Sequence, residues 1–285
     1  MIVALRDAEG QSGFENKQIY ARYFLHFFGG RNVSSITGEQ IYDSLPTHHQ
    51  ATKKPLANAT RNRYRSFIMR ALSMACKSGW IASQPHVPSL REPKVRVRWI
   101  DKRKARMLIS NLRYRWMRDV VSFALLTGAR KGEIFSLRWA NVDLSRKKAF
   151  IAAEDAKSGR SRQLPLSDEA VDILRRQPRE SDYPFSRDGV RAIEILRTDF
   201  ANALSASGID DFRFHDLRHT WASWHVQDGT PLMVLKELGG WEKLEMVNKY
   251  AHLGDEHLSR FSGAVTFLAQ PEGSEKNASK ITLVS

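Results

Sequence analysis

The sequence predicts a mainly α-helical protein with a small β-sheet, arranged as an all-helical N-terminal domain and an α+β C-terminal domain. Three observations support this fold class. The 285 residues are too many for one small core, so two domains are expected. Apolar residues recur at helical spacing through most of the chain. Strand-like patterns are confined to two short stretches, 148–153 and 161–166.

The N-terminal domain, residues 1–90, is predicted to contain only helices. Aromatic side chains at helical spacing predict a helix over residues 15–28, which a Gly-Gly pair ends. A second, short helix is expected to end at Pro46. The polar stretch 47–57 contains a proline and is expected to be a loop, and a long helix with one apolar face follows over 58–77.

Residues 91–99 are the predicted linker between the two domains. The surrounding stretch 85–100 is rich in proline and in basic residues, and prolines forbid a regular helix. We therefore place the domain boundary in this basic segment.

The C-terminal domain, residues 100–268, combines helices with one predicted β-hairpin. Lys157 lies at or near the turn between the two strand-like stretches. One helix carries His215, two more follow it, and a short amphipathic helix is expected over 258–268. The polar tail 269–285 is left unfolded. The other predicted helices span 101–112, 115–127, a segment that includes Ile134, Phe135 and Leu137, 167–177 and 189–207.

The charge of the chain is strongly positive and unevenly distributed. A formal net charge of +14 and a pI near 10.0 favour a polyanionic partner, and nucleic acid is the first candidate. Between Lys53 and Arg118 there are 18 Lys or Arg residues against 2 acidic ones, a net charge of +16. The positive field is therefore localised. The alternative is a basic protein that is merely soluble.

Arginines crowd the first half of the predicted 58–77 helix. They have no acidic residue between them and thus no partner within that stretch, which favours a phosphate-facing role over an ordinary solvated face. The four residues are Arg61, Arg63, Arg65 and Arg70. The predicted DNA contacts are Arg61, Arg63 and Arg65, with Arg96 and Arg98 from the linker region.

Composition also excludes several classes of protein. The single cysteine, Cys76, rules out an internal disulfide and disfavours a zinc–thiolate site. No acidic cluster resembles a magnesium site, so we expect neither a metal nor a cofactor. No run of 18 apolar residues predicts a membrane span, and the start lacks the apolar region of a signal peptide. We expect a soluble protein of a reducing compartment.

A set of polar residues in the C-terminal domain is suited to phosphodiester chemistry without a metal ion. Such chemistry needs proton removal from the attacking oxygen, compensation of negative charge, and a proton for the leaving oxygen. His215 and Arg218 are three apart and share one helix face, which pairs a proton-transfer group with a guanidinium fork. Arg130 is a second candidate clamp, and Glu133, three residues later, is expected to orient neighbouring donors.

Three further residues complete the set. Lys157 is suited to protonating the leaving oxygen, and Trp241, which only donates, is suited to holding a phosphate oxygen. Tyr250 is the candidate nucleophile. Each residue alone has a structural alternative, and His219 is expected to be supporting or structural. Four nearby basic residues compete with Lys157 for its role: Lys147, Lys148, Arg160 and Arg162.

In three sequence blocks the chain resembles the tyrosine recombinases, the phage integrase family. The blocks are Thr127-Gly128-Ala129-Arg130-Lys131-Gly132-Glu133, His215-Asp216-Leu217-Arg218-His219-Thr220, and Leu238-Gly239-Gly240-Trp241 through Tyr250-Ala251-His252. The resemblance implies that the catalytic residues are Arg130, Lys157, His215, Arg218, Trp241 and Tyr250. It covers about 95–268, and residues 14–90 resemble the core-binding domain of the family on architectural grounds.

Two features depart from the family pattern. The third block usually has a histidine directly after Leu-Gly, whereas here an extra Gly240 precedes Trp241. The distance to Tyr250 is kept, so we interpret Trp241 as a permitted variant. Only about 14 residues precede the first predicted helix, so the N-terminal domain that binds arm-type sites in many phage integrases is expected to be absent or truncated.

The resemblance implies a site-specific recombinase that forms a 3′-phosphotyrosyl link, frees a 5′-hydroxyl and exchanges strands through a Holliday junction. It also implies a clamp of two domains around double-stranded DNA and a homotetramer on two sites, with residues 258–268 as a docking helix. An accessory DNA-bending protein, a role in integration or excision of a phage or mobile element, and a place on the nucleoid in the cytoplasm of a bacterial or phage-infected cell are further expectations.

Three alternatives remain open. A type IB topoisomerase-like enzyme would use the same nucleophile but reseal the original strand. A decayed, non-catalytic relative would only bind its site, and a metal-dependent nuclease would be sensitive to EDTA and form no covalent adduct.

Overall fold

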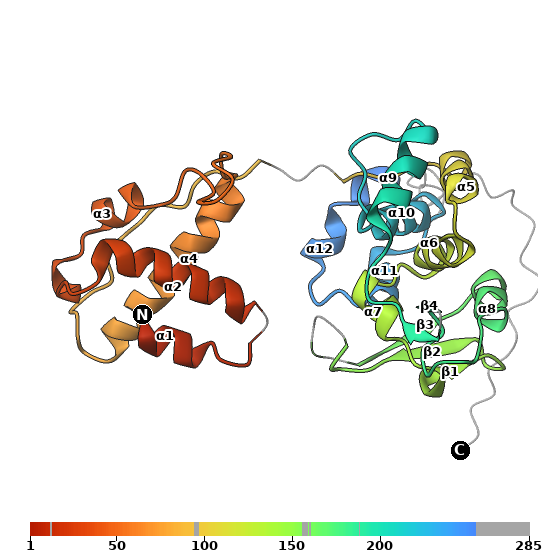
Figure 1. The fold of residues 1–285 in the computed structure, drawn as a ribbon, viewed down its shortest axis with the longest axis horizontal. Coiled ribbons are helices and arrows are strands. Elements are labelled where there is room, and N and C mark those ends of the chain that lie inside the picture. The colour runs from red at the N-terminus through yellow and green to blue at the C-terminus, as the bar shows by residue number, and fades with distance from the viewer. Residues whose placement is uncertain (12, 94–96, 156–158, 160, 188, 255–285) are drawn as a thin grey trace, which may run out of the picture. The chain divides into compact units, whose positions relative to one another are not determined.

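The computed structural model describes residues 1–254 except residues 12, 94–96, 156–158, 160 and 188. The chain divides into two compact units, unit 1 (Met1–Val95) and unit 2 (Arg96–Ser285). Helices account for most of the described structure, and the strands are short (Figure 1). This confirms the predicted fold class. The predicted helix over 258–268 and the tail 269–285 lie outside the described residues.

Unit 1 consists of helices in its described part. Its core is formed where α2 packs on α4, and the aromatic stripe predicted on the first helix faces this contact. Tyr20 and Tyr23 both pack against Tyr64, and Phe24 is fully buried beside them. The helices are α1 (Ile2–Asp7), α2 (Phe14–Phe28), a 3-10 turn (Val33–Ser35), α3 (Gly38–Asp43) and α4 (Asn58–Lys77).

The helix α1 was not predicted. It is only six residues long and has no side-chain cap at its start, so the sequence carries little local signal for it. It is held by tertiary packing, because Ala4 is buried against the core of unit 1.

Unit 2 contains the remaining helices and the described strands. The helices α6 and α10 lie side by side in the fold and pack together (Figure 1). The helices are α5 (Lys102–Asn111), α6 (Arg115–Thr127), α7 (Lys131–Ser136), α8 (Asp168–Arg175), α9 (Arg197–Ala206), α10 (Asp216–Gln227), α11 (Leu232–Gly239) and α12 (Glu245–Asn248), with 3-10 turns at Trp139–Asn141 and Ala251–Gly254.

The predicted hairpin is present as an antiparallel pair of strands. β2 (Lys148–Ile151) pairs with β3 (Arg162–Pro165), and Ile151 lies opposite Arg162 at the open end that leads to the turn. A two-residue strand, β1 (Val142–Asp143), adds to β2 and was too short to predict. Lys157, predicted for the turn, lies outside the described residues.

The predicted helix over 189–207 is wrong in its first part. β4 (Ser186–Arg187) and β5 (Val190–Arg191) form a small ribbon, and α9 begins only at Arg197. The backbone N–H of Ala192 bonds to the Phe185 carbonyl rather than to a helical partner. A local strand pairing therefore overrides an apolar spacing that also fits a helix.

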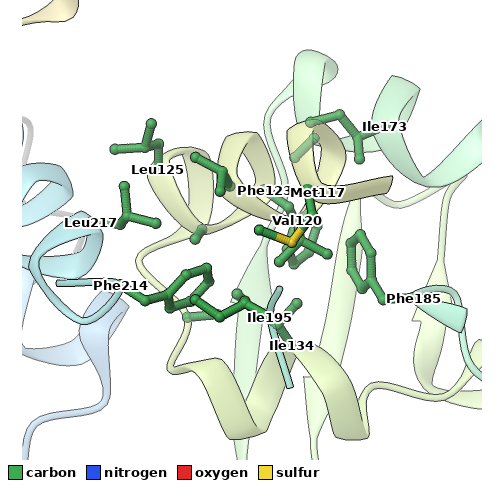
Figure 2. Packing of buried hydrophobic residues seen from close by; sticks show 14 of the residues in the cluster. Met117, Val120, Phe123, Leu125, Ile134, Ile173, Phe185, Ile195, Phe214 and Leu217 are labelled. Atoms are coloured by element: carbon green, nitrogen blue, oxygen red, sulfur yellow. The ribbon is translucent and has the colours of Figure 1, made fainter. Parts of the chain in front are cut away.

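The core of unit 2 centres on α6, as Figure 2 shows. Met117, Val120 and Phe123 of this helix are completely buried, and α6 packs between α8 and α10. Full burial of one such side chain contributes about 1.5–3 kcal/mol. This core holds α10, which carries Arg218 and directly follows His215, in a fixed position.

A second tie fixes α10 to the chain entering unit 2. The Trp224 Nε1–H donates to the Ile100 carbonyl at 3.0 Å, and the Ile100 N–H donates to Thr220 Oγ1 at 3.3 Å.

None of the described helices is long and apolar enough to span a bilayer. The described residues also contain no cluster of three or more His, Cys, Asp or Glu side chains with the geometry of a metal site.

Candidate active site

The turn between α6 and α7 positions Arg130. Gly128 ends α6 with a positive φ of 62°, a backbone conformation that favours glycine. A Cβ at Gly128 would also lie 2.2 Å from the Trp221 ring, so the glycine lets α6 approach α10 closely. Arg130 then begins α7 as its N-cap residue, and its guanidinium group is mostly buried.

Glu133 joins two arginines into one network. Its carboxylate accepts hydrogen bonds from the Arg130 backbone N–H at 2.9 Å and from the Arg130 guanidinium at 2.6 Å. It also accepts one from the Arg162 guanidinium of β3 at 2.8 Å. Only 1% of the Glu133 side chain is exposed. Burial by itself would raise the pKa of this carboxyl, but Arg162 and the Arg130 backbone and side chain hold the pKa below its usual value. Glu133 is thus a buried carboxylate that orients two cations.

Arg218 is fixed from three sides. It is 3% exposed, and its Nη1 and Nη2 donate at 2.6 Å to the carbonyls of Gly128 and Gly239. Its guanidinium carbon lies 4.1 Å from the centre of the Trp241 ring, in cation–π contact. Burial, and then the positive charge of Arg130, lowers the pKa of Arg218 to about 9, so the group is cationic at neutral pH.

Three guanidinium groups converge on the C-terminal end of α11. Arg162 donates to the Leu238 carbonyl at 3.0 Å, Arg218 to the Gly239 carbonyl at 2.6 Å, and Arg130 to the Gly240 carbonyl at 3.2 Å. The end of a helix carries partial negative charge, which stabilises the cations there. Among the described residues Glu133 is the one carboxylate bonded to this trio, so the four side chains carry a net charge of +2. The cluster is suited to a phosphate.

The two glycines before Trp241 make room for this arrangement. A Cβ at Gly239 would lie 2.0 Å from the Trp241 ring, and a Cβ at Gly240 would lie 2.4 Å from Cδ of Arg162. Gly240 also has a positive φ of 61° as the cap of α11. The extra glycine in the third block is therefore linked to Arg162, a residue 78 positions earlier in the chain.

Trp241 is packed among other aromatic rings. It is 7% exposed and stacks on Trp221 with ring centres 6.1 Å apart. Its other neighbour is Tyr250, with ring centres 6.0 Å apart. Trp241 thus connects the Arg218 guanidinium to the tyrosine.

Tyr250 follows α12 and is completely buried. Its hydroxyl lies 2.5 Å from Nδ1 of His219, a residue of α10. The Lys249 ammonium lies 5.0 Å from the centre of the Tyr250 ring. Burial raises the pKa of Tyr250 above its ordinary value, although Arg218 opposes the shift, so the phenol is protonated at neutral pH.

His215 stands immediately before α10, one turn from His219. The two imidazole rings meet edge to face with centres 5.2 Å apart. The pKa of His215 is lowered, first by loss of hydration and then by the positive charge of Arg218. His215 is therefore largely neutral at neutral pH, and it lies beside His219 rather than at the tyrosine hydroxyl.

The structure brings together six of the seven predicted site residues in unit 2: Arg130, Glu133, His215, Arg218, Trp241 and Tyr250. Lys157 lies outside the described residues. Sequence reasoning missed two members of the site. Arg162 was seen only as a competitor of Lys157, and its burial on β3 depends on long-range contacts. His219 carried one usable signal, because it is one helical turn from His215.

The arginines predicted to contact DNA differ from one another. On α4, Arg63 is exposed, whereas Arg65 donates twice to the Val87 carbonyl. Arg61 is half-buried, and its Nε has no hydrogen-bond partner among the described residues. Arg98 pairs with Asp211. Arg96 lies outside the described residues.

The α4 arginines have no acidic partner within their own stretch, as expected, but Arg70 has one outside it. This residue forms an ion pair with Asp7 at 2.9 Å, and Asp7 belongs to the unpredicted helix α1. The partner was missed because it lies far away in the sequence.

Comparison with known proteins places the chain in one family. A sequence profile of the phage integrase family matches residues 98–257. The integrase of Salmonella phage P22 is 34% identical over 279 residues, which cover 83% of this chain and 71% of that protein. The shufflon-specific DNA recombinase of Escherichia coli is 27% identical over 257 residues, which cover 85% of this chain and 64% of that protein. The chain thus spans about two thirds of the length of these two relatives.

A solved structure shows the same fold. It is a lambda integrase fragment, in a dimer bound to a COC′ core site, and it matches with a TM-score of 0.65 and 19% identity. The match covers 83% of this chain and 90% of the lambda integrase chain.

Proposed function

The chain belongs to the phage integrase family and is a site-specific tyrosine recombinase, and we propose that Tyr250 is the nucleophile with which it cuts and rejoins DNA. The resemblance inferred from the three sequence blocks is thereby confirmed. One observation carries the assignment of the nucleophile. The Tyr250 hydroxyl, from the third block, is bonded to the α10 helix that presents Arg218 from the second block.

In the proposed reaction, Tyr250 Oη attacks the scissile phosphorus and forms a 3′-phosphotyrosyl ester. The bond between phosphorus and the 5′ oxygen breaks, and a 5′-hydroxyl is released. A 5′-hydroxyl from the partner duplex then attacks the ester and frees the tyrosine. Two such rounds exchange both strand pairs through a Holliday junction. Because an ester bond is kept at every stage, the exchange needs no energy-supplying cofactor.

The arginine cluster is proposed to hold the phosphate. Arg130 and Arg218 are each fixed on a backbone carbonyl, which leaves further N–H groups of each fork to meet the non-bridging oxygens. Donors fixed in advance stabilise the negative charge of the transition state without reorganisation. Trp241 is proposed as a further donor, His215 as a proton relay, and Lys157 as the acid for the leaving 5′ oxygen.

The proposed partner is double-stranded DNA, gripped by both units. The exposed arginines of α4 and the basic segment around Arg98 would contact the backbone. The lambda integrase of similar fold is seen as a dimer on a core site, which supports DNA as the substrate. We further propose a homotetramer on two sites, an accessory DNA-bending protein, and action on bacterial or phage DNA in the cytoplasm during integration or excision.

A covalent-trapping assay tests this function. The protein is mixed, in EDTA, with nicked duplexes taken from the ends of the element that encodes it, so that a cleaved strand end diffuses away. We expect a protein–DNA adduct on a denaturing gel that is absent for Tyr250→Phe. Specific binding of DNA without any adduct would instead favour a non-catalytic DNA-binding protein.

A second assay separates recombination from strand relaxation. Two duplexes with matching sites are incubated with the protein, and joined products are scored. Exchange between duplexes is expected. Adduct formation with resealing of the original strand alone would indicate a type IB topoisomerase-like activity, and cleavage that EDTA abolishes would indicate a metal-dependent nuclease.

A further inference from the structure

The Tyr250 hydroxyl has a partner that the family pattern in the sequence does not assign. His219 Nδ1 lies 2.5 Å from Tyr250 Oη, which is a short hydrogen bond. Tyr250 is completely buried, so bulk water does not reach the hydroxyl to remove its proton. A proton leaving Oη in this arrangement passes to His219.

We propose that His219 is a catalytic residue that accepts the Tyr250 proton as the tyrosine attacks the phosphate. The proposal rests on the proposed role of Tyr250 as nucleophile. It separates the two histidines of the His215-Asp216-Leu217-Arg218-His219 block by position. His219 lies at the attacking oxygen. The His215 ring centre lies 5.2 Å from the His219 ring centre, and His215 is the more exposed of the two residues.

In the resting protein both groups of this hydrogen bond are uncharged. Loss of hydration, then the positive charge of Lys249 and the electrostatic effects of His215 and Arg218, lower the pKa of His219 to about 3. The imidazole is therefore neutral, and its Nδ1 accepts the hydrogen bond of a protonated Tyr250. A bound phosphodiester brings negative charge beside the same cations. Its charge offsets their effect on His219, so the imidazole becomes a stronger base when the substrate is in place.

The proton balance of the step is closed. As the Oη–P bond forms, the Oη proton moves to Nδ1 of His219. The bond from phosphorus to the 5′ oxygen breaks, and the proposed acid, Lys157, protonates that oxygen. In the rejoining step the incoming 5′-hydroxyl attacks phosphorus and gives its proton to the now neutral Lys157 amine, the Oη–P bond breaks, and His219 returns its proton to Tyr250. No proton is gained or lost over one round.

Other groups near Tyr250 are placed less well for this transfer. The Lys249 ammonium lies over the face of the Tyr250 ring rather than at the hydroxyl, and Arg218 donates to two carbonyls and stays cationic. Ser223, one turn further along α10, donates its hydroxyl to the backbone carbonyl of His219 and not to the Tyr250 hydroxyl. The imidazole is therefore the group in contact with the reacting oxygen.

Two substitutions separate hydrogen bonding from proton transfer. Asparagine places an oxygen near the position of Nδ1, so His219→Asn keeps an acceptor for Tyr250 but cannot take the proton. His219→Ala removes both functions. We expect single-turnover cleavage of the nicked duplex to fall about 100-fold or more in each variant. His225→Asn is the matched control on the same helix, because His225 bonds Thr230 outside the site, and its rate should stay within about two-fold of the wild type.

A modified substrate shows which side of the reaction His219 serves. In a 5′-bridging phosphorothiolate the leaving group is a thiolate that needs no acid. This substrate should restore cleavage by Lys157→Ala, whose defect lies in the leaving group. It should not restore His219→Asn, because its defect lies at the nucleophile. Thermal unfolding and DNA binding are measured for each variant, and His219→Gln, with the same expectation, is used if His219→Asn does not fold.

Two results would overturn the proposal. One is cleavage by a folded His219→Asn protein at close to the wild-type rate, and the other is rescue of this variant by the phosphorothiolate. Neither result would contradict the assignment of Tyr250 as the nucleophile. That assignment is contradicted by a different result, an adduct that still forms with Tyr250→Phe.

Discussion

The two units use arginine in opposite ways. In unit 2, Arg130, Arg162 and Arg218 are mostly buried, and each is held on a backbone carbonyl at the end of α11. In unit 1, the α4 arginines lie on one turn after another of a single helix, and Arg63 and Arg70 are exposed. The first set is fixed before any ligand arrives. In the second set Arg63 and Arg70 extend into water, although Arg70 pairs with Asp7, and Arg65 is bonded to the Val87 carbonyl.

This difference predicts different contributions to function. A fixed guanidinium stabilises charge that develops at one point, which affects the rate of the chemical step. An exposed arginine neutralises phosphates wherever the backbone passes, which affects affinity and its dependence on salt. Substitutions in the two sets should therefore change different measurements.

The largest effect is expected for Arg218→Lys. Lysine keeps the charge but lacks the planar guanidinium, which donates to the Gly128 and Gly239 carbonyls and can donate to a phosphate at the same time. Covalent adduct formation in single turnover should fall about 100-fold or more, while DNA affinity changes little. Arg175→Lys, an exposed arginine of α8, is the control and should cleave normally. A normal rate for Arg218→Lys would show that fork geometry is unimportant.

The second largest effect is expected for Glu133→Gln, on the free energy of unfolding and on its dependence on pH. The pKa of Glu133 lies below its ordinary value of 4.5 in the folded chain, so the unfolded chain takes up the proton first. The stabilisation is therefore present above about pH 4.5 and is lost as the pH falls through the folded value. At pH 7 the substitution should lower the free energy of unfolding by about 1–3 kcal/mol. Denaturant unfolding from pH 3 to pH 7 should show a smaller acid-induced loss in the variant than in the wild type.

A smaller effect is expected for Gly240→Ala. The new Cβ would meet Arg162 at 2.4 Å, and alanine is strained at a φ of 61°. Gly208→Ala is a matched control, because Gly208 has a φ of 60° and no atom within 4 Å of the added Cβ. Both should lose about 1–2 kcal/mol from backbone strain. Only Gly240→Ala should also slow adduct formation, by about ten-fold, because it displaces the guanidinium that bonds Glu133.

The smallest effect is expected on α4. Arg63→Gln should weaken DNA binding evenly across sequences and reduce the slope of affinity against salt by about 1. Arg70→Gln should do less, because Asp7 already offsets the charge of Arg70. Fluorescence anisotropy with labelled duplexes over a salt series compares the two. Equal slopes for both variants would show that the Asp7 pair does not screen Arg70 from DNA.

The sequence could predict most of the helices because their signals are local. The ranges 58–77 and 115–127 coincide with α4 and α6, since apolar spacing and a terminal glycine or serine mark them within one segment. The stretch 189–196 could not be predicted in the same way. Its backbone partners come from β4 and Phe185, and an apolar spacing cannot show which partner a segment finds.

The sequence by itself determined the fold class, the three motif blocks and the family to which they belong, because those depend on residue types at short fixed spacings. The tertiary structure decided what these residues touch. It bonded Arg162 to Glu133 and to the end of α11, and it brought Arg162 so close to Gly240 that a side chain at Gly240 would collide with it. It also placed His219 rather than His215 at the Tyr250 hydroxyl. These contacts join segments separated by about thirty to eighty residues, and only the packing of α10, α11 and β3 brings them within hydrogen-bonding distance.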